Sequence, residues 1–448
     1  MPVSFNREID SWSLARLREI QHQRLRQLVD TVYEKVPFYR QKFQEKGLKP
    51  SAISRLEDLH QLPFTKKTDL RDHYPFGLFA VEPGEVLRLH CSSGTTGNPI
   101  VAGYTRHDLD VFAEVVARSL SAAGCRPGMK LQNAYGYGLF TGGLGLHYGA
   151  EKLGMTVIPV SGGGTERQLM LLQDFQPEAL CCTPSYALTL AEEINRRGID
   201  PGQLALRYAI LGAEPWTESI RRVVEDRLHV RATNIYGLSE VIGPGVSQED
   251  VDERGTGSYV WEDHFYPEVV DRDSGEPLPE GKPGVLVFTT LTKEAMPVIR
   301  YWTNDITTLY HDSQGKRNFI KMGPIIGRAD DMLIIRGVNL FPTQIEAQLQ
   351  GFSSFSTNYQ LVVTREGTMD DVEVRVELSD EWFGELRRQS ETAGTETHES
   401  VTTVSQQLQR LLKEHIGLTM RITAVAPGTI PRSEGGKLNR ILDLRKTI

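Results

Sequence analysis

The residues best suited to chemistry form a short run of hydroxyls and glycines after a strand-like segment. They are Ser92, Ser93, Gly94, Thr95, Thr96 and Gly97. Glycines let the backbone approach a ligand closely, and hydroxyls with successive N–H groups can cradle phosphate oxygens. The run is not a G-x-x-x-x-G-K-[ST] loop, and no G-x-G-x-x-G follows a strand, so the two commonest nucleotide folds are disfavoured. The pattern indicates a nucleotide triphosphate site, with a plain Ser/Thr/Gly turn as the alternative.

A second group of useful side chains ends the strand-like run ATNIYG. Tyr236 offers an aromatic face, Ser239 a hydroxyl and Glu240 a carboxylate, with the flexible Gly237 between them. Open α/β sheets bind ligands at the carboxyl ends of their strands. The carboxylate suits Mg²⁺, a hard ion that prefers oxygen ligands and substrate phosphates. A simple turn is the alternative interpretation.

Three further side chains have the chemistry to bind a nucleotide. Asp305 can accept both hydroxyls of a ribose, and Arg328 can pair with phosphate through its planar fork. Lys437, after Gly435-Gly436, can reach into a site as a mobile point charge. Each of them alone would be interpreted as a solvated surface group.

The elements that must position these residues alternate between strand and helix. Six β-branched runs between about 87 and 291 alternate with helix-like stretches at 107–123, 165–175, 185–197 and 217–227. Such alternation predicts parallel βαβ units with helices covering the sheets. Apolar positions three and four residues apart also predict an exposed amphipathic helix over 14–35.

The pattern changes after about residue 330. Short strand-like runs (MLIIRG, YQLVVTR, DVEVRVEL, RITAVA) are mixed with helical stretches, among them 403–415, which predicts a small α+β unit. The Thr-, Glu- and Ser-rich stretch 391–403 is predicted to be a solvated loop within it. We therefore expect two domains, 1–329 and 330–448.

Composition excludes several classes of protein. The chain has 448 residues, 39% of them hydrophobic, and a formal net charge of −8 with no basic block, so nucleic acid is an unexpected partner. No apolar run is long enough to span a membrane, and charged residues occupy the place of a signal core, so we expect a soluble, cytoplasmic protein. The four cysteines contain no C-x-x-C pair, and we expect them to be reduced.

Taken together and in this order, the motifs resemble the adenylate-forming superfamily of acyl-CoA synthetases, adenylation domains and luciferases. The sequence between these motifs is similar to that of the phenylacetate-CoA ligase family of aryl-CoA ligases, from about residue 5 to the C-terminus. The segments that carry this similarity are 133–154, 183–188, 212–218, 236–246, 261–268 and 291–301.

The resemblance implies an α/β fold, with a large N-terminal α/β domain of stacked βαβ-type sheets and a small, mobile C-terminal α+β domain. It implies a ligase that uses ATP and Mg²⁺ to convert an aromatic acid into an acyl-adenylate with release of pyrophosphate. Coenzyme A then displaces AMP to give a thioester. Phenylacetate, anthranilate and another benzoate are all open as the acid.

The same resemblance assigns roles residue by residue. Glu240 is the Mg²⁺ ligand, Lys437 the donor to the α-phosphate and carboxylate, and Asp330 the hinge of the C-terminal domain. Arg336 and Gly337 line the coenzyme A tunnel. The ATP and AMP contacts are 92–97, Glu214, Pro215, Asn234, Tyr236, Gly237, Ser239, Asp305 and Arg328. The pocket for the acid is lined by Tyr135, Tyr137, Phe140, Gly142, Ala213 and Gly237.

Several positions depart from the family's pattern. Asn98 replaces a lysine that usually follows the phosphate loop, which predicts weaker ATP binding. Trp302 and Asn304 replace residues that are commonly arginines. No cysteines follow GPGV at 243–246, so no structural zinc is expected there.

Two other functions stay open at this stage. The enzyme could load its acyl-adenylate onto a carrier-protein thiol in secondary metabolism, or Asn98 could mark a nucleotide-binding relative without catalysis. Lys437, Glu240 and Asp305 argue against the second. His147 and His264 are assigned structural roles. The amphipathic helix over 14–35 leaves a homodimer open.

Overall fold

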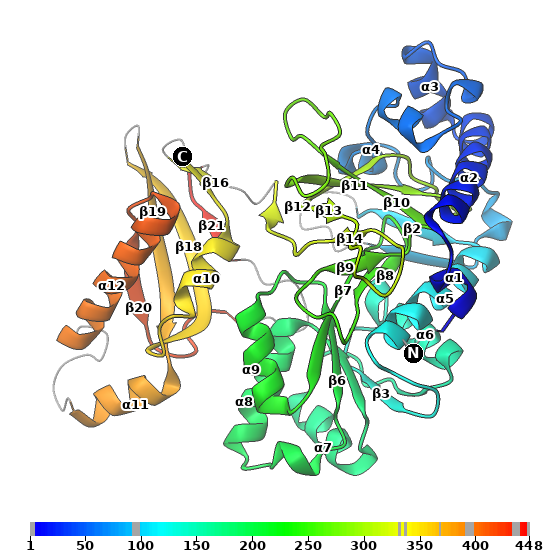
Figure 1. The fold of residues 1–448 in the computed structure, drawn as a ribbon. Helices are drawn as coiled ribbons and strands as arrows, with labels where there is room; N and C mark the ends of the chain where they lie inside the picture. Colours follow the sequence, from blue (N-terminus) through cyan, green and yellow to red (C-terminus); the bar gives the residue numbers. More distant parts are fainter. Residues whose placement is uncertain are drawn as a thin grey trace. The chain divides into compact units, whose positions relative to one another are not determined.

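The structure is a computed structural model, and it forms two compact units (Figure 1). The first comprises Met1–Glu214 with Arg222–Ile325, and the second comprises Pro215–Arg221 with Ile326–Ile448. The main division thus follows Ile325, whereas the sequence analysis expected it after residue 329. The residues that the structure describes are 5–91, 99–329, 333–335, 338–366, 369–389, 398–431 and 440–445.

The first unit is built around a nine-stranded mixed sheet in the order β13-β14-β9-β8-β7-β6-β5-β3-β4. Strands β3 to β7 are parallel, and β8, β9, β13 and β14 extend the sheet in antiparallel pairs. The predicted parallel βαβ pattern therefore describes only half of the sheet. The strands are β3 (Lys130–Asn133), β4 (Thr156–Ile158), β5 (Ala179–Cys182), β6 (Tyr208–Gly212), β7 (Arg231–Leu238), β8 (Gly243–Glu249), β9 (Ser258–Val260), β13 (Leu309–Tyr310) and β14 (Lys321–Met322).

Helices cover both faces of the parallel half. Because crossovers between parallel strands are right-handed, the reversal of direction after β4 places α6 on one face and α7, α8 and α9 on the other (Figure 1). Helix α5 packs against α6 and β8. These helices are α5 (Arg106–Ala122), α6 (Thr141–Leu153), α7 (Thr165–Phe175), α8 (Pro184–Arg196) and α9 (Glu218–Leu228).

A second, antiparallel arrangement lies beside this sheet in the same unit. Strand β11 (Gly284–Thr290) pairs with β10 (Phe265–Val270) on one side and β12 (Tyr301–Thr307) on the other. A separate ribbon of β1 (Arg88–Cys91) and β2 (Val101–Tyr104) flanks the predicted phosphate loop. The remaining helices are α1 (Arg7–Asp10), α2 (Leu14–Lys35), α3 (Pro37–Glu45), η1 (Pro50–Ala52), η2 (Leu56–Gln61), α4 (Lys67–Asp72), η3 (Pro83–Glu85) and η4 (Pro201–Gln203).

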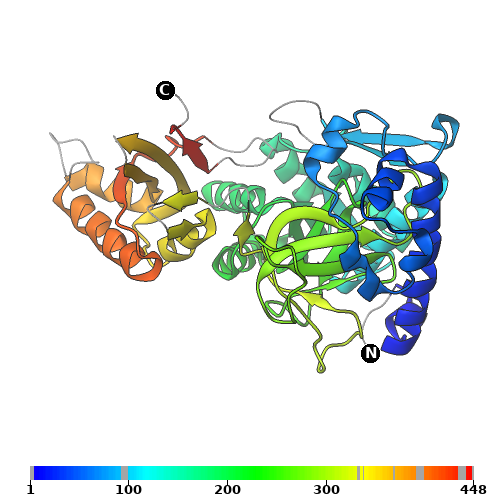
Figure 2. The same ribbon diagram turned by 90° about the horizontal axis from the view of Figure 1, so that it is seen from above.

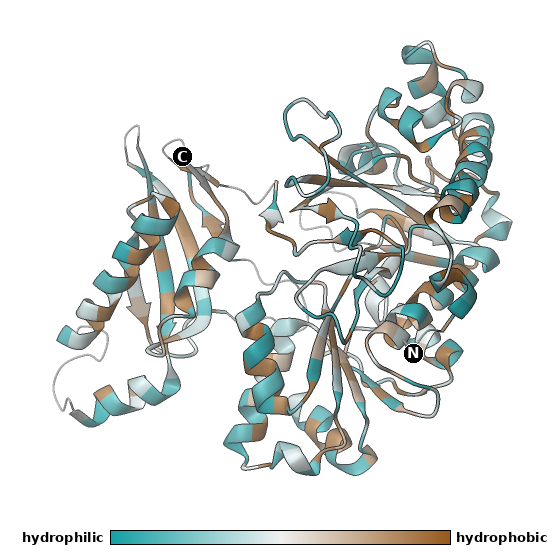
Figure 3. Cartoon of the chain, viewed as in Figure 1, coloured by the Kyte–Doolittle hydropathy of each residue, from teal (hydrophilic) through white to brown (hydrophobic). Residues whose placement is uncertain are grey.

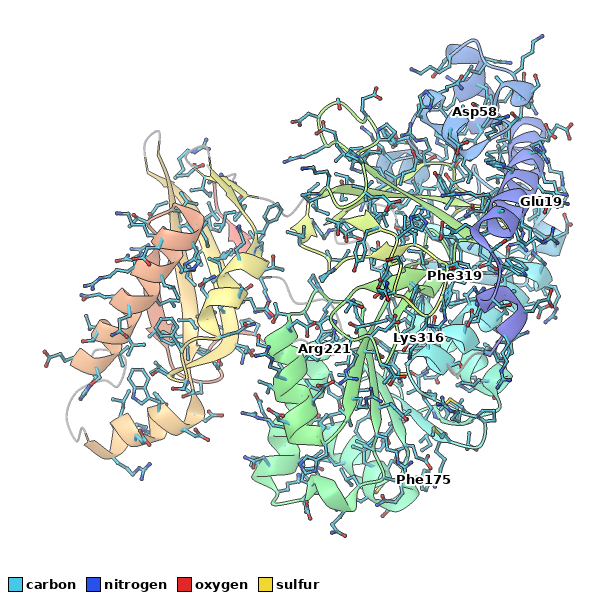
Figure 4. The ribbon with its side chains drawn as sticks, viewed as in Figure 1. Glu19, Asp58, Phe175, Arg221, Lys316 and Phe319 are labelled. Carbon is cyan, nitrogen blue, oxygen red and sulfur yellow. The ribbon has the colours of Figure 1, made fainter. Side chains whose placement is uncertain are left out.

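Aromatic packing and buried ion pairs tie distant parts of this unit together. The ring of Phe319, labelled in Figure 4, meets that of Trp261 edge to face at a centroid distance of 5.8 Å. Next to it, Arg317 donates to Asp10 at 3.0 Å and to Asp250 at 2.7 Å. These buried contacts join the N-terminal segment to the strands of the large sheet.

The second unit is a four-stranded sheet in the order β20-β19-β18-β21, with α10 and α12 on one of its faces (Figures 1 and 2). Brown, apolar stretches run along its strands, and α12 carries brown and teal residues along its length (Figure 3). The elements are β15 (Gly327–Arg328), β16 (Leu333–Ile335), β17 (Val338–Leu340), α10 (Pro342–Leu349), β18 (Phe355–Glu366), β19 (Met369–Leu378), α11 (Asp380–Gln389), α12 (Glu399–Ile416), β20 (Arg421–Val425) and β21 (Ile441–Asp443).

The predicted helices over 14–35 and 165–175 are confirmed with the same bounds in α2 and α7. The predicted loop over 391–403 is wrong in its last five residues, because α12 already begins at Glu399. The His398 side chain accepts a hydrogen bond from the N–H of Ser400, and Val401 is buried. Capping and burial therefore outweigh the polar composition of this stretch. Within the described residues, no helix has both the length and the apolar composition needed to cross a membrane.

We expect Leu25→Ala in α2 to lower the free energy of unfolding by about 2–5 kcal/mol, because Leu25 is fully buried and its truncation leaves a cavity. Leu14 in the same helix is 46% exposed, so Leu14→Ala is the matched control and should change stability by less than about 0.5 kcal/mol. Guanidinium unfolding followed by circular dichroism measures both. Equal losses would contradict the assignment of the buried face of α2.

Candidate functional site

Several of the predicted site residues lie where three parallel strands end at one edge of the large sheet. Residues of β5, β6 and β7 pair in register, with Leu211 opposite both Cys182 and Asn234. The residues that follow these strands must therefore emerge side by side. Glu214 follows β6, and Tyr236 lies in the last part of β7, so the two predicted adenine contacts share this edge.

Helix α8 holds Glu214 in place. The Ser185 N–H donates to Glu214 Oε2 at 3.2 Å, and the Ser185 hydroxyl donates to Oε1 at 3.0 Å. Ser185 lies in the first turn of α8, where the orphan N–H groups and the positive end of the helix dipole favour an anion. This carboxylate is thus oriented by the fold, and it forms a wall of the site.

A hydrogen bond between the two sheets brings two further predicted residues together. The Tyr236 hydroxyl donates to Asp305 Oδ2 at 2.6 Å. The Tyr236 ring also stacks on Phe288 of β11, with a centroid distance of 6.3 Å and an interplanar angle of 30°. Asp305 donates its own N–H to the Thr303 hydroxyl at 3.0 Å. An aromatic face and a carboxylate are therefore fixed next to each other, as adenine and ribose binding requires.

The backbone is packed tightly beside Tyr236. The pairing of β7 with β8 shifts register between Tyr236 and Gly237. A Cβ added to Gly237 would lie 1.8 Å from the carbonyl oxygen of Gly243, so no side chain fits at position 237. Asn234, two residues before Tyr236, donates its N–H to Glu249 Oε2 at 3.0 Å. The end of β7 is consequently a rigid platform.

Glu240 lies in the turn between β7 and β8. It is 7% exposed, and its carboxylate accepts no hydrogen bond from a described residue. The neighbouring Ser239 hydroxyl lies 3.2 Å from that of Thr141. A buried carboxylate without donors fits a divalent cation, which supplies the missing positive charge.

The described residues contain no cluster of three or more His, Cys, Asp or Glu side chains suited to a metal ion. A metal bound to Glu240 would take its other ligands from water and phosphate oxygens, which is typical of Mg²⁺ in phosphate chemistry. The donor set therefore fits Mg²⁺ brought in with a nucleotide better than a cage made by the protein alone.

The segment between β3 and α6 carries the predicted acid pocket. Tyr135 is buried, and its hydroxyl donates to the carbonyl of Cys182 at 2.6 Å. The Tyr137 hydroxyl accepts from Asn133 Nδ2 at 2.9 Å and lies 3.1 Å from His147 Nδ1. Burial raises the pKa of Tyr137 to about 12, so its hydroxyl stays neutral. Hydrogen bonds thus fix both tyrosines.

Phe140 and Gly142 at the start of α6, and Ala213 after β6, are the remaining residues of the predicted acid pocket. Phe140 precedes α6 and is 39% exposed, and its ring covers Gly142, where an added Cβ would fall 2.4 Å from Phe140 Cε1. Ala213, between β6 and Glu214, adopts a φ of 69° in the left-handed region. An alanine there implies that the surrounding structure holds a strained turn.

Pro215 and Arg328, two further predicted site residues, belong to the second unit. Other predicted residues lie outside the described part of the chain: Ser92, Ser93, Gly94, Thr95, Thr96, Gly97, Asp330, Arg336, Gly337 and Lys437. The departure Asn98 lies outside it as well.

Sequence reasoning missed several side chains that support the site. Phe288 stacks on Tyr236, and Asn133 orients Tyr137. His147 continues that array with Nε2 at 3.1 Å from Glu151 Oε1. The i, i+4 spacing of His147 and Glu151 was a usable signal, whereas the contact of Phe288 depends on the pairing of two sheets.

The comparisons with known proteins identify the family of the whole chain. Residues 9–292 match the AMP-binding enzyme family, and residues 337–445 match the AMP-binding enzyme C-terminal domain. A phenylacetate-coenzyme A ligase of Thermus thermophilus is 60% identical over 446 residues, which cover 99% of this chain and 100% of the relative. The chain belongs to the phenylacetate-CoA ligase family of AMP-binding enzymes. The expected enzyme class, an AMP-forming acid–thiol ligase, is confirmed by this membership.

Two further comparisons support the family and its fold. The phenylacetate-coenzyme A ligase of Escherichia coli is 50% identical over 441 residues, which cover 98% of both chains. A crystal structure of 2-hydroxyisobutyryl-CoA ligase in the postadenylation state superposes with a TM-score of 0.89 at 28% identity, covering 100% of this chain and 94% of that one. The expected α/β fold with a large N-terminal and a smaller C-terminal part is confirmed.

We expect Tyr236→Phe to raise the KM for ATP about three- to tenfold, because it removes the net value of one hydrogen bond to a charged group that holds Asp305. The turnover number should change less. Tyr33→Phe in α2, another partly buried tyrosine, is the control and should leave the KM unchanged. Steady-state kinetics at varied ATP measures both variants. An unchanged KM in Tyr236→Phe would exclude Asp305 as a nucleotide contact held by this bond.

Proposed function

We propose that this protein is an ATP-dependent phenylacetate-CoA ligase. The observation that carries the proposal is the 60% identity to a phenylacetate-coenzyme A ligase over 99% of the chain. The structure supports it through the hydrogen-bonded pair of Tyr236 and Asp305 and through the largely buried Glu240, whose carboxylate accepts no hydrogen bond from a described residue. ATP-dependent aryl-CoA ligation through an acyl-adenylate is the activity of the family.

In the first step, a carboxylate oxygen of the acid attacks the α-phosphorus of ATP. The new O–P bond gives the acyl-adenylate, and the bond to the bridging oxygen breaks to release pyrophosphate. Tyr236 would bind the adenine face and Asp305 the ribose hydroxyls, and Lys437 would donate to the oxygens that gain charge. Mg²⁺, held by Glu240 and the phosphate oxygens, would supply neutralising charge for the two anions that meet.

In the second step, the sulfur of coenzyme A attacks the acyl carbonyl, the thiol proton is lost, and AMP leaves as the C–O bond breaks. The family resemblance assigns this step to a second position of the C-terminal domain, reached by rotation at Asp330. Lys437 then leaves the site, and the side of the domain that bears Arg336 and Gly337 lines the pantetheine path.

The acid would lie against the segment between β3 and α6. Tyr137 is held through its hydroxyl, which favours a fixed aromatic wall, and the absence of a side chain at Gly142 lets the ring of Phe140 pack directly on the start of α6. Such a slot fits a flat ring. Phenylacetate is the first choice because four relatives that are 49–60% identical carry its name. Benzoate lacks one methylene of phenylacetate, which is worth only about 1–3 kcal/mol, and anthranilate lacks the same methylene and adds an amino group.

The decisive test is ATP–pyrophosphate exchange with phenylacetate, benzoate, anthranilate, salicylate, cinnamate and medium-chain fatty acids, with thioester formation followed in parallel. We expect exchange and thioester with phenylacetate, and loss of both when EDTA removes divalent cations. Exchange with phenylacetate but thioester only on a carrier-protein thiol would overturn the coenzyme A assignment. Absence of exchange with every acid would overturn the proposal and make Asn98 the first suspect.

The proposed division of labour predicts a selective defect in Lys437→Ala. Adenylation should fall by about 10²–10³-fold, the usual loss for one preorganised donor. Thioester formation from synthetic phenylacetyl-adenylate should be nearly unchanged, because Lys437 would not act in that step. Single-turnover assays of each half-reaction separate the two. Equal losses in both would contradict the two-position scheme.

A further inference from the structure

One lysine ammonium of the first unit is buried without an acceptor. Lys293, in the loop after β11, is 6% exposed, and its Nζ has no hydrogen-bond partner among the described residues. The ammonium lies 3.9 Å from the centre of the Tyr104 ring, in a cation–π contact. Burying a charge costs free energy unless it is paired. The buried ammonium of Lys293 therefore lowers the stability of the folded state.

Three elements surround Lys293 and connect it to the site. Asp108 at the start of α5 accepts the N–H groups of Glu294 at 2.7 Å and Ala295 at 2.9 Å, the two residues after Lys293. The Tyr104 hydroxyl donates to the carbonyl of Ile242 at 2.8 Å, in the turn that also contains Glu240. The ammonium is thus held between the start of α5 and the turn of Glu240.

The charges that act on Lys293 come from those same elements. Burial lowers the pKa of Lys293 to about 8, and the carboxylates of Asp108 and Glu240 oppose that shift. On the side of β1, the His90 ring meets Tyr104 edge to face, and burial, with Lys293 adding to it, lowers the pKa of His90. His90 is consequently neutral, and Lys293 is the buried cation of this cluster at neutral pH, while the charge of Arg88 also acts on His90 and Tyr104.

A second buried lysine, Lys321, differs from Lys293 in that its ammonium has acidic and hydroxyl partners. Lys321 is fully buried and over a tyrosine ring as well, with Nζ 4.8 Å from the centre of Tyr259. Unlike Lys293, it donates to Asp312 at 2.8 Å and to Thr256 at 3.0 Å, and lies 3.0 Å from Glu253. The fold therefore satisfies one buried lysine completely and leaves the other without an acceptor, beside Glu240.

We propose that Lys293 is a positioning residue for the nucleotide, an internal cation that offsets the negative charge of the metal–ATP complex from behind Glu240. This inference rests on the proposed function, which places the triphosphate at Glu240. The phosphate loop and the residue after it, 92–98 (SSGTTGN), contain no ionisable side chain, so this segment adds no positive charge to that of Mg²⁺ and Lys437. With Lys293, one of the two anions Asp108 and Glu240 is balanced, whereas without it both would repel an anionic ligand.

Lys293 would act through space and not by contact. Its Nζ is closed off from solvent, so an arriving phosphate cannot bond to it without rearrangement of the walls. Because the surroundings of Lys293 are poorly solvated, water and salt screen its charge only weakly. Lys293 also makes no hydrogen bond to the Glu240 oxygens, so these stay available to a metal ion. The same charge repels a bare divalent cation, so its removal should weaken binding of the metal–nucleotide complex without weakening that of the metal alone.

The test compares Lys293→Met, which keeps length and removes charge, with Lys293→Arg, which keeps charge. Calorimetry with α,β-methylene-ATP and Mg²⁺ measures nucleotide binding, and electron paramagnetic resonance measures binding of Mn²⁺ alone. In Lys293→Met we expect nucleotide affinity to fall about tenfold, the effect of one unit charge at an effective dielectric constant near 20. Affinity for Mn²⁺ should not fall, turnover at saturating ATP should stay within about threefold, and Lys293→Arg should recover most of the nucleotide affinity.

Lys321→Met is the matched control for loss of a buried ammonium. It should lower the thermal unfolding midpoint, since it strands acidic partners, and leave nucleotide affinity unchanged. Lys293→Met, which breaks no hydrogen bond, should change the midpoint little. Unchanged nucleotide affinity in Lys293→Met, or an equal loss in Lys293→Arg, would overturn the inference. The proposed function is judged separately, by exchange in the unaltered enzyme.

Discussion

The hydrogen bond from Tyr236 to Asp305 is the constraint on which the geometry of the candidate nucleotide site depends. The two residues lie in different sheets, and only the packing of those sheets brings them within 2.6 Å. Phe288, on β11, which pairs with the strand of Asp305, supports the Tyr236 ring. The Tyr236 ring and the Asp305 carboxylate, which we propose as the adenine and ribose contacts, are therefore positioned by the core of the first unit.

Much of the fold was readable from the sequence because local signals were strong. Apolar spacing gave the bounds of α2, and runs of β-branched residues marked most strands of the parallel half. β3 was missed, since its four residues Lys130–Asn133 include two polar amides and no β-branched side chain. The antiparallel extension of the sheet was also missed, because strand direction depends on pairing between segments distant in the chain.

For the site, the sequence identified residue types but not their surroundings. The carboxylate of Glu240 was predicted from its place at a strand end, yet the buried Lys293 near it has no local signature. The unusual pair Trp302 and Asn304 also becomes intelligible only in three dimensions. Trp302 Nε1 donates to Asn304 Oδ1 at 2.8 Å, and Asn304 has a φ of 67°, which asparagine tolerates well. The two departures form one local unit next to Asp305.

The close approach at Gly237 has a consequence for how this enzyme can diverge. Because the carbonyl of Gly243 fills the place of a side chain, position 237, which we propose as an acid contact, cannot be used to reshape the pocket. The partly exposed Phe140, on the segment before α6, is free of that restriction. Changes of substrate within a lineage would therefore accumulate on one connecting segment, while the nucleotide half stays as it is. A duplicated copy of this enzyme could change its acid specificity through substitutions on that segment, with its ATP-binding residues unchanged.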